Sequence, residues 1–293
     1  MDLNALKLFV RVADVLSFTQ AAQALGLTQS GVSRAVARLE DELRVKLINR
    51  NTHAVSLTPD GLYLYDMARR LIGELDDVGQ RLNGRALSPE GELRITTPSA
   101  YGRLVTLPLL KTILDRYPAL KIDAVMTDRL VDVVEEGFDA AIRIGHLTDS
   151  RLIGRTIRHL KFTTVASPAY LRKHGAPAVP DDLLQHNCLV VKGAGTGRRT
   201  KWRYRLGERV QHLDVSGNLT VDTADALLEA ALCGIGIVQI MDFAVARYIE
   251  SGHLVDVLPD FAVADIPLTL LYAKSRHRSP KIAALLAAFG LAG

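Results

Sequence analysis

The chain has 293 residues, of which 48% are hydrophobic and 23% are charged. This composition is typical of a folded globular protein and excludes collagen-like, disordered and disulfide-rich chains. The length fits two domains of roughly 100–200 residues each, and the net charge of +4 is compatible with an anionic partner. No apolar run reaches the roughly 20 residues of a membrane helix, and charges interrupt the N-terminal stretch. We therefore expect a cytoplasmic protein without a membrane partner.

Three short helices and a hairpin are predicted for the first 57 residues. Apolar residues recur at helical spacing over residues 3–13. Ser17 then fits the cap of a second helix, which Gly26 ends because glycine accepts left-handed backbone geometry. Thr28 fits the cap of a third helix. Residues 43–57 have the pattern of a short hairpin.

The second and third helices, over residues 17–40, have the arrangement of a helix-turn-helix, whose second helix enters the DNA major groove. Gln, Ser and Arg side chains on its polar face can bond base edges or phosphates. The expected DNA-binding residues are Thr28, Gln29, Ser30, Ser33, Arg34 and Arg38, with Lys46 and Arg50 on phosphate. The alternative is an ordinary helical hairpin with a solvated face.

A long helix is predicted from Thr58-Pro59 to Asn83, because threonine at the cap and proline in the first turn favour a helix start. Six of its residues follow a 4-3-4-3-4 spacing, which is typical of a coiled-coil seam. The expected dimerisation residues are Leu64, Ala68, Leu71, Leu75, Val78 and Leu82. The alternative is a lone amphipathic helix packed on its own domain.

Strands alternate with helices after residue 90, which predicts βαβ units and a parallel sheet. Strands are expected at residues 93–97, 120–126, 140–144, 162–166, 189–191, 219–221, 237–240 and 268–272. Helices are expected at residues 128–136, 168–173, 223–232, 243–250 and 280–289, with a further one ending near Tyr117. The predicted fold class is therefore an α+β multidomain chain.

Signatures of common enzymes are missing from the sequence. The glycine-rich stretch at 193–197 lacks the last glycine of GxGxxG, where Arg198 stands, so a surface loop is favoured. Neither GxSxG nor HExxH occurs, and the eight histidines show no metal-ligand spacing. Cys188 and Cys233 are expected to be buried, unreactive thiols, with a redox switch as the alternative. We therefore predict no catalytic residue, metal or cofactor.

Nearly the whole chain resembles the LysR-type transcriptional regulators. The most specific matches are Phe18-Thr19-Gln20-Ala21-Ala22 and Thr28-Gln29-Ser30, and later ones include Glu136-Gly137-Phe138-Asp139 and Cys233-Gly234-Ile235-Gly236-Ile237. The resemblance implies a winged helix-turn-helix over 1–58, a linker (dimerisation) helix over 59–88 and an effector-binding domain over 89–293. That domain has the two-lobed α/β architecture of the type 2 periplasmic binding proteins. Lobe I holds residues 91–160 and 266–293, and lobe II holds 161–265.

The effector is expected between the two lobes. Ser99 and Thr127 each follow a strand, and open α/β sheets bind ligands at the carboxyl ends of their strands. Both are expected to precede helices, whose N-termini favour anions. Arg143 can pair a carboxylate of the effector or, alternatively, the nearby Asp128. The family places effector contacts at these turns. The expected effector-binding residues are Ser99, Ala100, Tyr101, Thr127, Arg143 and Gly145, with Lys192, Asp222 and Gln239 as weaker candidates.

The sequence therefore predicts a DNA-binding transcriptional regulator controlled by a small organic effector, with a carboxylate as the hypothesis for its chemical class. The expected partners are a double-stranded operator and further copies of the chain, which form a homodimer or, as the family resemblance implies, a homotetramer. The main alternative is a solute-binding protein without regulatory DNA reading, which the helix-turn-helix disfavours. An enzyme and a shape-reading architectural DNA protein are weaker alternatives.

Overall fold

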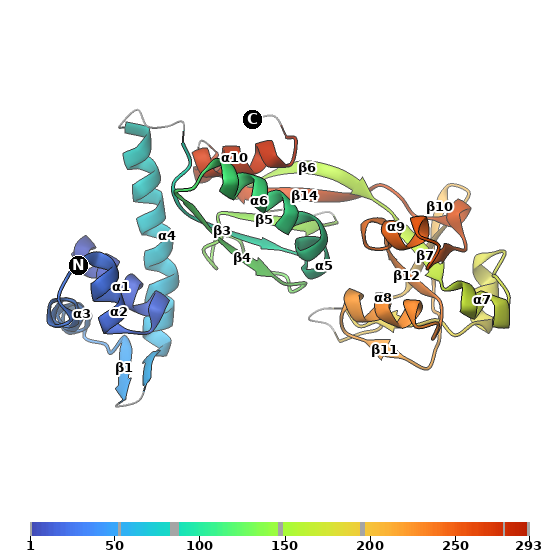
Figure 1. The fold of residues 1–293 in the computed structure, drawn as a ribbon, viewed down its shortest axis with the longest axis horizontal. Coiled ribbons are helices and arrows are strands. Elements are labelled where there is room, and N and C mark those ends of the chain that lie inside the picture. The colour runs from blue at the N-terminus through green and yellow to red at the C-terminus, as the bar shows by residue number, and fades with distance from the viewer. Residues whose placement is uncertain are drawn as a thin grey trace. The chain divides into compact units, whose positions relative to one another are not determined.

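The computed structural model describes residues 2–51, 54–82, 88–145, 149–193, 197–277 and 279–291 (Figure 1). The chain forms two compact units. The first consists of Met1–Ser88 and Asp132–Phe138, and the second of Pro89–Val131 and Asp139–Gly293. Each unit has its own hydrophobic core.

The first unit is mainly helical. Its elements are α1 (Leu3–Val15), α2 (Phe18–Leu25), α3 (Gln29–Leu43), the antiparallel strands β1 (Ile48–Asn51) and β2 (Ala54–Leu57), and α4 (Pro59–Leu82). The core is built by apolar side chains from all three short helices, among them Phe9, Ala21 and Val36. The predicted helices and hairpin are confirmed.

The caps of these helices are the ones that the sequence predicted. Ser17 Oγ accepts from the Gln20 amide at 3.3 Å, and Gly26 ends α2 with a φ of +65°. Thr58 Oγ1 accepts from the Gly61 amide at 2.9 Å. A Cβ on Gly61 would lie 1.9 Å from the Leu47 carbonyl oxygen, so only glycine lets α4 start this close to the hairpin.

Lobe I of the second unit is a five-stranded sheet with the order β4-β3-β5-β14-β6. Its strands are β3 (Gly91–Thr97), β4 (Leu120–Met126), β5 (Ala140–Ile144), β6 (Leu152–Leu160) and β14 (Ile266–Ala273). A helical run accompanies it, made of α5 (Ser99–Tyr101), the π-helix η1 (Gly102–Thr106) and α6 (Leu107–Arg116), together with η4 (Lys274–Arg276) and α10 (Pro280–Ala288). Side chains of β3, α6, β14 and α10 share one core.

Lobe II contains smaller sheets. Strands β12 (Val238–Met241), β7 (Phe162–Ala166) and β13 (Val255–Asp256) pair in that order, all antiparallel. Strands β8 (Val190–Val191) and β11 (Thr220–Val221) are parallel, and β9 (Trp202–Leu206) and β10 (Arg209–Leu213) form a hairpin. The helices are α7 (Pro168–His174), η2 (Pro180–Gln185), α8 (Ala224–Leu232), α9 (Asp242–Glu250) and η3 (Pro259–Phe261).

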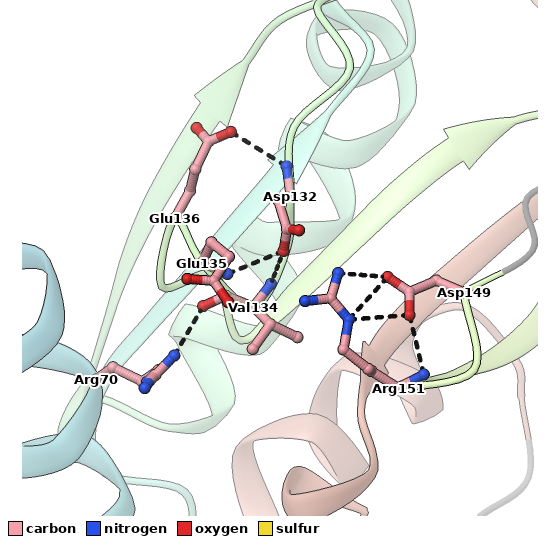
Figure 2. Close-up of polar contacts among 7 residues, drawn as sticks. All are labelled: Arg70, Asp132, Val134, Glu135, Glu136, Asp149 and Arg151. Carbon is pink, nitrogen blue, oxygen red and sulfur yellow. Dashed lines mark hydrogen bonds and ion pairs between the residues drawn. The ribbon is translucent and has the colours of Figure 1, made fainter.

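The predicted helix at 128–136 is wrong, because this stretch forms a turn. Asp132 Oδ1 accepts from the amides of Val134 and Glu135 at 3.0 and 2.9 Å, and Glu136 Oε1 accepts from the Asp132 amide at 3.1 Å (Figure 2). An aspartate that bonds nearby amides in this way competes with helix formation. Within the first unit, Arg70 Nη1 also donates to the Val134 carbonyl at 3.3 Å.

The predicted parallel sheet is only partly correct. Strand β3 is parallel to β4 and β5, but β14 is antiparallel to both β5 and β6. The sheet is therefore mixed, because β14 enters it from the other lobe.

Candidate functional sites

One face of α3 is exposed and polar while the opposite face is buried. Val32, Val36 and Leu39 lie in the core of the first unit. The exposed residues are Gln29, Ser30, Arg34 and Arg38. Ser33 is half-buried at the edge of this face. The helix therefore offers the predicted polar residues on one surface.

Local hydrogen bonds order the start of this surface. Thr28 Oγ1 caps α3 by accepting from the Gly31 amide at 3.1 Å, and it lies 3.4 Å from Ser30 Oγ. Arg34 Nε donates to the Ser30 carbonyl at 3.2 Å. These bonds hold the guanidinium group along the first turn of the helix, where a major-groove reader makes base contacts.

The C-terminal part of α3 fixes the hairpin through a buried acid that the sequence analysis did not identify as functional. Glu40 is 4% exposed, and its Oε1 accepts from the amides of Leu47 and Ile48 at 2.9 and 3.1 Å. Its Oε2 accepts from Lys46 Nζ at 3.0 Å. The exposed Lys46, predicted to touch phosphate, is thus also a partner of Glu40. The side chain of Arg50 lies outside the described residues.

The predicted seam on α4 divides into two parts. Leu64 packs against the core of the first unit and Ala68 is buried in it. For these two residues the structure agrees with the alternative, a helix that packs on its own domain. Leu71 and Leu75 are 42% and 50% exposed. The side chains of Val78 and Leu82 lie outside the described residues.

The carboxyl ends of β3 and β4 meet, as chain order predicted. The Ser99 amide donates to Asp128 Oδ1 at 3.1 Å, and the Thr127 amide donates to the Thr97 carbonyl at 2.9 Å. Thr127 Oγ1 accepts from the Arg129 amide at 3.2 Å. Ser99 opens a helical run, but no helix follows Thr127, so the expected helix N-terminus is present only at Ser99.

The other predicted effector residues are more deeply placed. Ala100 and Tyr101 are buried, and burial raises the pKa of Tyr101. Arg143 is 7% exposed and donates to the Ile142 carbonyl and to Thr96 Oγ1, each at 2.9 Å. Gly145 follows β5 with a φ of +98°, which favours glycine.

Contacts between the lobes involve residues that the sequence pattern did not connect. The Tyr101 ring lies edge-on to Phe243 of α9, with ring centroids 5.1 Å apart. Arg103 of η1 forms an ion pair with Asp225 of α8. Tyr101, predicted as an effector contact, therefore also packs against lobe II.

The weaker candidates of lobe II differ in burial. Lys192 and Asp222 are exposed. Gln239 is buried, and its amide group accepts from the Arg203 amide and donates to the Arg203 carbonyl, each at 2.9 Å. The side chain of Gln239 therefore holds β9 against the sheet.

The two cysteines differ from each other. Cys188 is buried, burial raises its pKa to about 12, and its Sγ donates to the Leu183 carbonyl at 3.3 Å, so the expectation of an inert core thiol is confirmed. Cys233 is exposed, so its predicted burial is wrong. It lies just after the last residue of α8, where the helix end leaves its side chain in solvent.

Among the described residues, no three His, Cys, Asp or Glu side chains are grouped to hold a metal ion. None of the helices in the described ranges has both the length and the apolar character needed to cross a membrane.

Comparison with known proteins places both parts of the chain. Residues 3–62 match the family described as "Bacterial regulatory helix-turn-helix protein, lysR family", and residues 86–291 match "LysR substrate binding domain". An HTH-type transcriptional repressor of Pseudomonas aeruginosa is 34% identical over 96% of this chain and 88% of its own length. CrgA, a LysR-type transcriptional regulator from Neisseria meningitidis, is 29% identical, with a TM-score of 0.63 over 99% of this chain and 98% of CrgA.

A second full-length structure, of the Vibrio cholerae virulence activator AphB, is 25% identical, with a TM-score of 0.60 over 99% of this chain and 98% of AphB. The helix-turn-helix and the substrate-binding domain thus occur together in this chain, which disfavours a solute-binding protein. The chain therefore belongs to the LysR family of transcriptional regulators, with a helix-turn-helix for DNA and a C-terminal effector-binding domain.

Proposed function

We propose that the exposed face of α3 enters the major groove of an operator. The observation that carries this proposal is the polar surface of Gln29, Ser30, Arg34 and Arg38 opposite a fully packed apolar face. Arginine can bond guanine with two hydrogen bonds, and glutamine can bond adenine in the same way. Ser33 lies at the edge of this contact and Thr28 fixes its start. Lys46 and Arg50 bind phosphate.

The alanine variant of Arg34 is expected to bind its operator roughly 5- to 150-fold more weakly and with relaxed site choice. A lost bidentate base contact costs about 1–3 kcal/mol, which corresponds to this change in Kd. Genomic footprinting supplies the operator, and fluorescence anisotropy with matched and mutated sites measures affinity. Arg172→Ala removes an equal charge from the exposed part of α7 and serves as the control. Unchanged affinity and specificity of Arg34→Ala would remove this residue from the interface.

We further propose that the effector is a small carboxylate, which the chain binds without chemical turnover, at the joined ends of β3 and β4. The hydroxyls of Ser99 and Thr127 lie on the two turns that the Ser99–Asp128 hydrogen bond connects. The start of the helical run at Ser99 favours an anion. The guanidinium of Arg143, on the strand β5 beside β3, adds positive charge that favours a carboxylate. Ala100, Tyr101 and Gly145 shape the walls of this site.

Closure of the two lobes around the effector would then carry the effect of binding to the DNA-binding unit. The Arg103–Asp225 ion pair and the Tyr101–Phe243 contact join elements of the two lobes close to this site. A ligand that favours one arrangement of the lobes shifts their equilibrium toward it. We propose that this shift sets the activity of the DNA-binding unit.

Loss of either hydroxyl is expected to weaken effector binding about tenfold or more. Hydrogen bonds to charged groups contribute about 1.5–3 kcal/mol. A thermal-shift screen of the full chain against small mono- and dicarboxylates identifies the ligand, and calorimetry compares Ser99→Ala and Thr127→Val with the parent. Thr112→Val, on the exposed side of α6, is the control. An uncharged effector, or equal binding by both variants, would contradict the assignment.

A further inference from the structure

A cavity of about 320 Å³ lies in lobe II beside α9. This volume is at the lower end of the range for small-molecule sites, which is about 300–1,000 Å³. Its walls come from the end of β6, from β7, α9 and β13, and its lining residues are Arg158, Lys161, Thr163, Asp242, Phe243, Val245, Ala246, Ile249, Glu250 and Asp256. None of them belongs to the effector site proposed above.

Three oxygen atoms of this lining are buried without a hydrogen-bond partner in the part of the chain that the structure describes. They are Thr163 Oγ1, Asp242 Oδ1 and Asp256 Oδ1. Thr163 is only 2% exposed. Buried polar atoms without partners are uncommon in folded proteins, because losing water without replacement is unfavourable. Three of them around one cavity indicate that a bound molecule supplies the missing donors.

The charges of the lining indicate which donor fits. Arg158 and Lys161 face three acids, Asp242, Glu250 and Asp256, so the lining carries one more negative than positive charge. Arg158 Nη2 already donates to Asp242 Oδ2 at 2.7 Å. Burial raises the pKa of Asp256, although the Leu258 amide and the charge of Lys161 act in the opposite direction. A positively charged donor would therefore be favoured here.

The remaining wall is apolar. Val245, Ala246 and Ile249 lie on one side of α9, next to Phe243. Helix α9 packs on β7, which carries Thr163 (Figure 1). The cavity thus joins a polar end to an aliphatic wall, which suits a molecule with one charged group and a hydrocarbon arm.

We propose that this cavity binds a small aliphatic ammonium compound. An ammonium group has three N–H donors and no acceptor, which matches three oxygen atoms that need donors. Its hydrocarbon arm lies against Val245 and Ile249. A bare metal ion fits less well, because the described residues contain no group of three suitable ligands. The cavity shares no lining residue with the proposed carboxylate site and touches it through the contact of Phe243 with Tyr101, so either proposal can fail alone.

Calorimetry of the full chain with n-butylamine tests the proposal, with butan-1-ol and butyrate as probes of similar size. We expect the amine alone to bind at millimolar concentrations or below. Thr163→Val and Asp256→Asn are each expected to weaken it at least about tenfold, since the first removes the hydroxyl acceptor and the second removes the negative charge that attracts the ammonium group. The exposed Asp260 supplies the control Asp260→Asn, and Ser99→Ala tests independence from the effector site.

Thermal melts of each variant separate loss of binding from loss of folding, and the two variants act on different strands. Absence of amine binding would overturn the proposal and leave ordered water as the partner of these oxygens. Equal binding of butan-1-ol would overturn the charge argument. Full-affinity binding to both folded variants would place the amine elsewhere.

Discussion

Replacing Glu40 with alanine is expected to lower the free energy of unfolding of the N-terminal unit by roughly 2–6 kcal/mol. The substitution leaves the buried amides of Leu47 and Ile48 without an acceptor, and each such loss costs about 1–3 kcal/mol. It also removes the ion pair with Lys46, which contributes little because Lys46 is exposed. The hairpin would lose its register against α3.

The full chain allows this measurement without cutting the units apart. Its one tryptophan, Trp202, is buried in lobe II, so its fluorescence follows the second unit during denaturation in urea. Far-ultraviolet circular dichroism follows the helices α1 to α4 as well. Glu40→Ala should shift an early circular dichroism transition to lower urea while the fluorescence transition stays in place. Asp41→Ala, at an exposed neighbour on α3, is the control. A change below about 0.5 kcal/mol for Glu40→Ala would contradict this account.

The contribution of the Glu40 carboxyl to stability is expected to depend on pH. Burial alone would raise the pKa of Glu40, but the amides of Leu47 and Ile48 and the Lys46 ammonium outweigh it and lower the pKa. A carboxyl with a lowered pKa stabilises the fold above its unfolded value of about 4.3, and this stabilisation is lost as the pH falls through the folded value. The stability difference between the parent and Glu40→Gln should therefore narrow below pH of about 4.3.

Local signals explain why most of the fold could be predicted. Helix caps such as Ser17, Thr28 and Thr58 act within three residues, so the sequence alone reveals them. Glu40 follows Val36 by four residues and so lies on the apolar face of α3, which is a readable sign of a buried acid. The groups that donate to this carboxylate, however, are backbone amides of the hairpin, and no pattern of side chains in the sequence identifies them.

There are also physical reasons why some elements of the fold could not be predicted from the sequence. Strand β6 lies at the edge of its sheet, and its exposed residues do not alternate with buried ones, so the usual pattern is absent. In strand β10 of the β9–β10 hairpin every residue from Arg209 to His212 is exposed, so buried and exposed residues do not alternate there either. The turn at 132–136 has apolar residues at helical spacing, but Asp132 bonds the nearby amides instead.

The proposed effector site was predictable to the extent that it depends on chain order. Parallel neighbouring strands bring their carboxyl ends together, which is why Ser99 and Thr127 could be paired from sequence. The packing of Tyr101 against Phe243 and the unpartnered oxygen of Thr163 depend on contacts between distant segments. Such contacts leave no periodic trace in the sequence, so they require the folded structure.

Leu71→Asp is expected to raise the dissociation constant of the homodimer by a factor of roughly 100 or more. We propose that Leu71 and Leu75 form the seam between two copies of α4, since both are exposed while Leu64 and Ala68 pack into their own domain. An aspartate at the seam would place an unpaired charge in an apolar contact, which costs several kcal/mol. The folded monomer should be unaffected, because Leu71 contributes little to its core.

Leu62→Asp is the matched control for this experiment. Leu62 is an exposed leucine of the same helix, and it precedes Leu71 by nine residues, or two and a half turns at 3.6 residues per turn, so the two lie on opposite faces. Sedimentation velocity over a range of concentrations measures the dimer, and circular dichroism confirms the fold. A palindromic operator needs two linked recognition helices, so Leu71→Asp should also weaken operator binding while Leu62→Asp does not. If both variants remain dimers, α4 only packs on its own domain and another surface joins the copies.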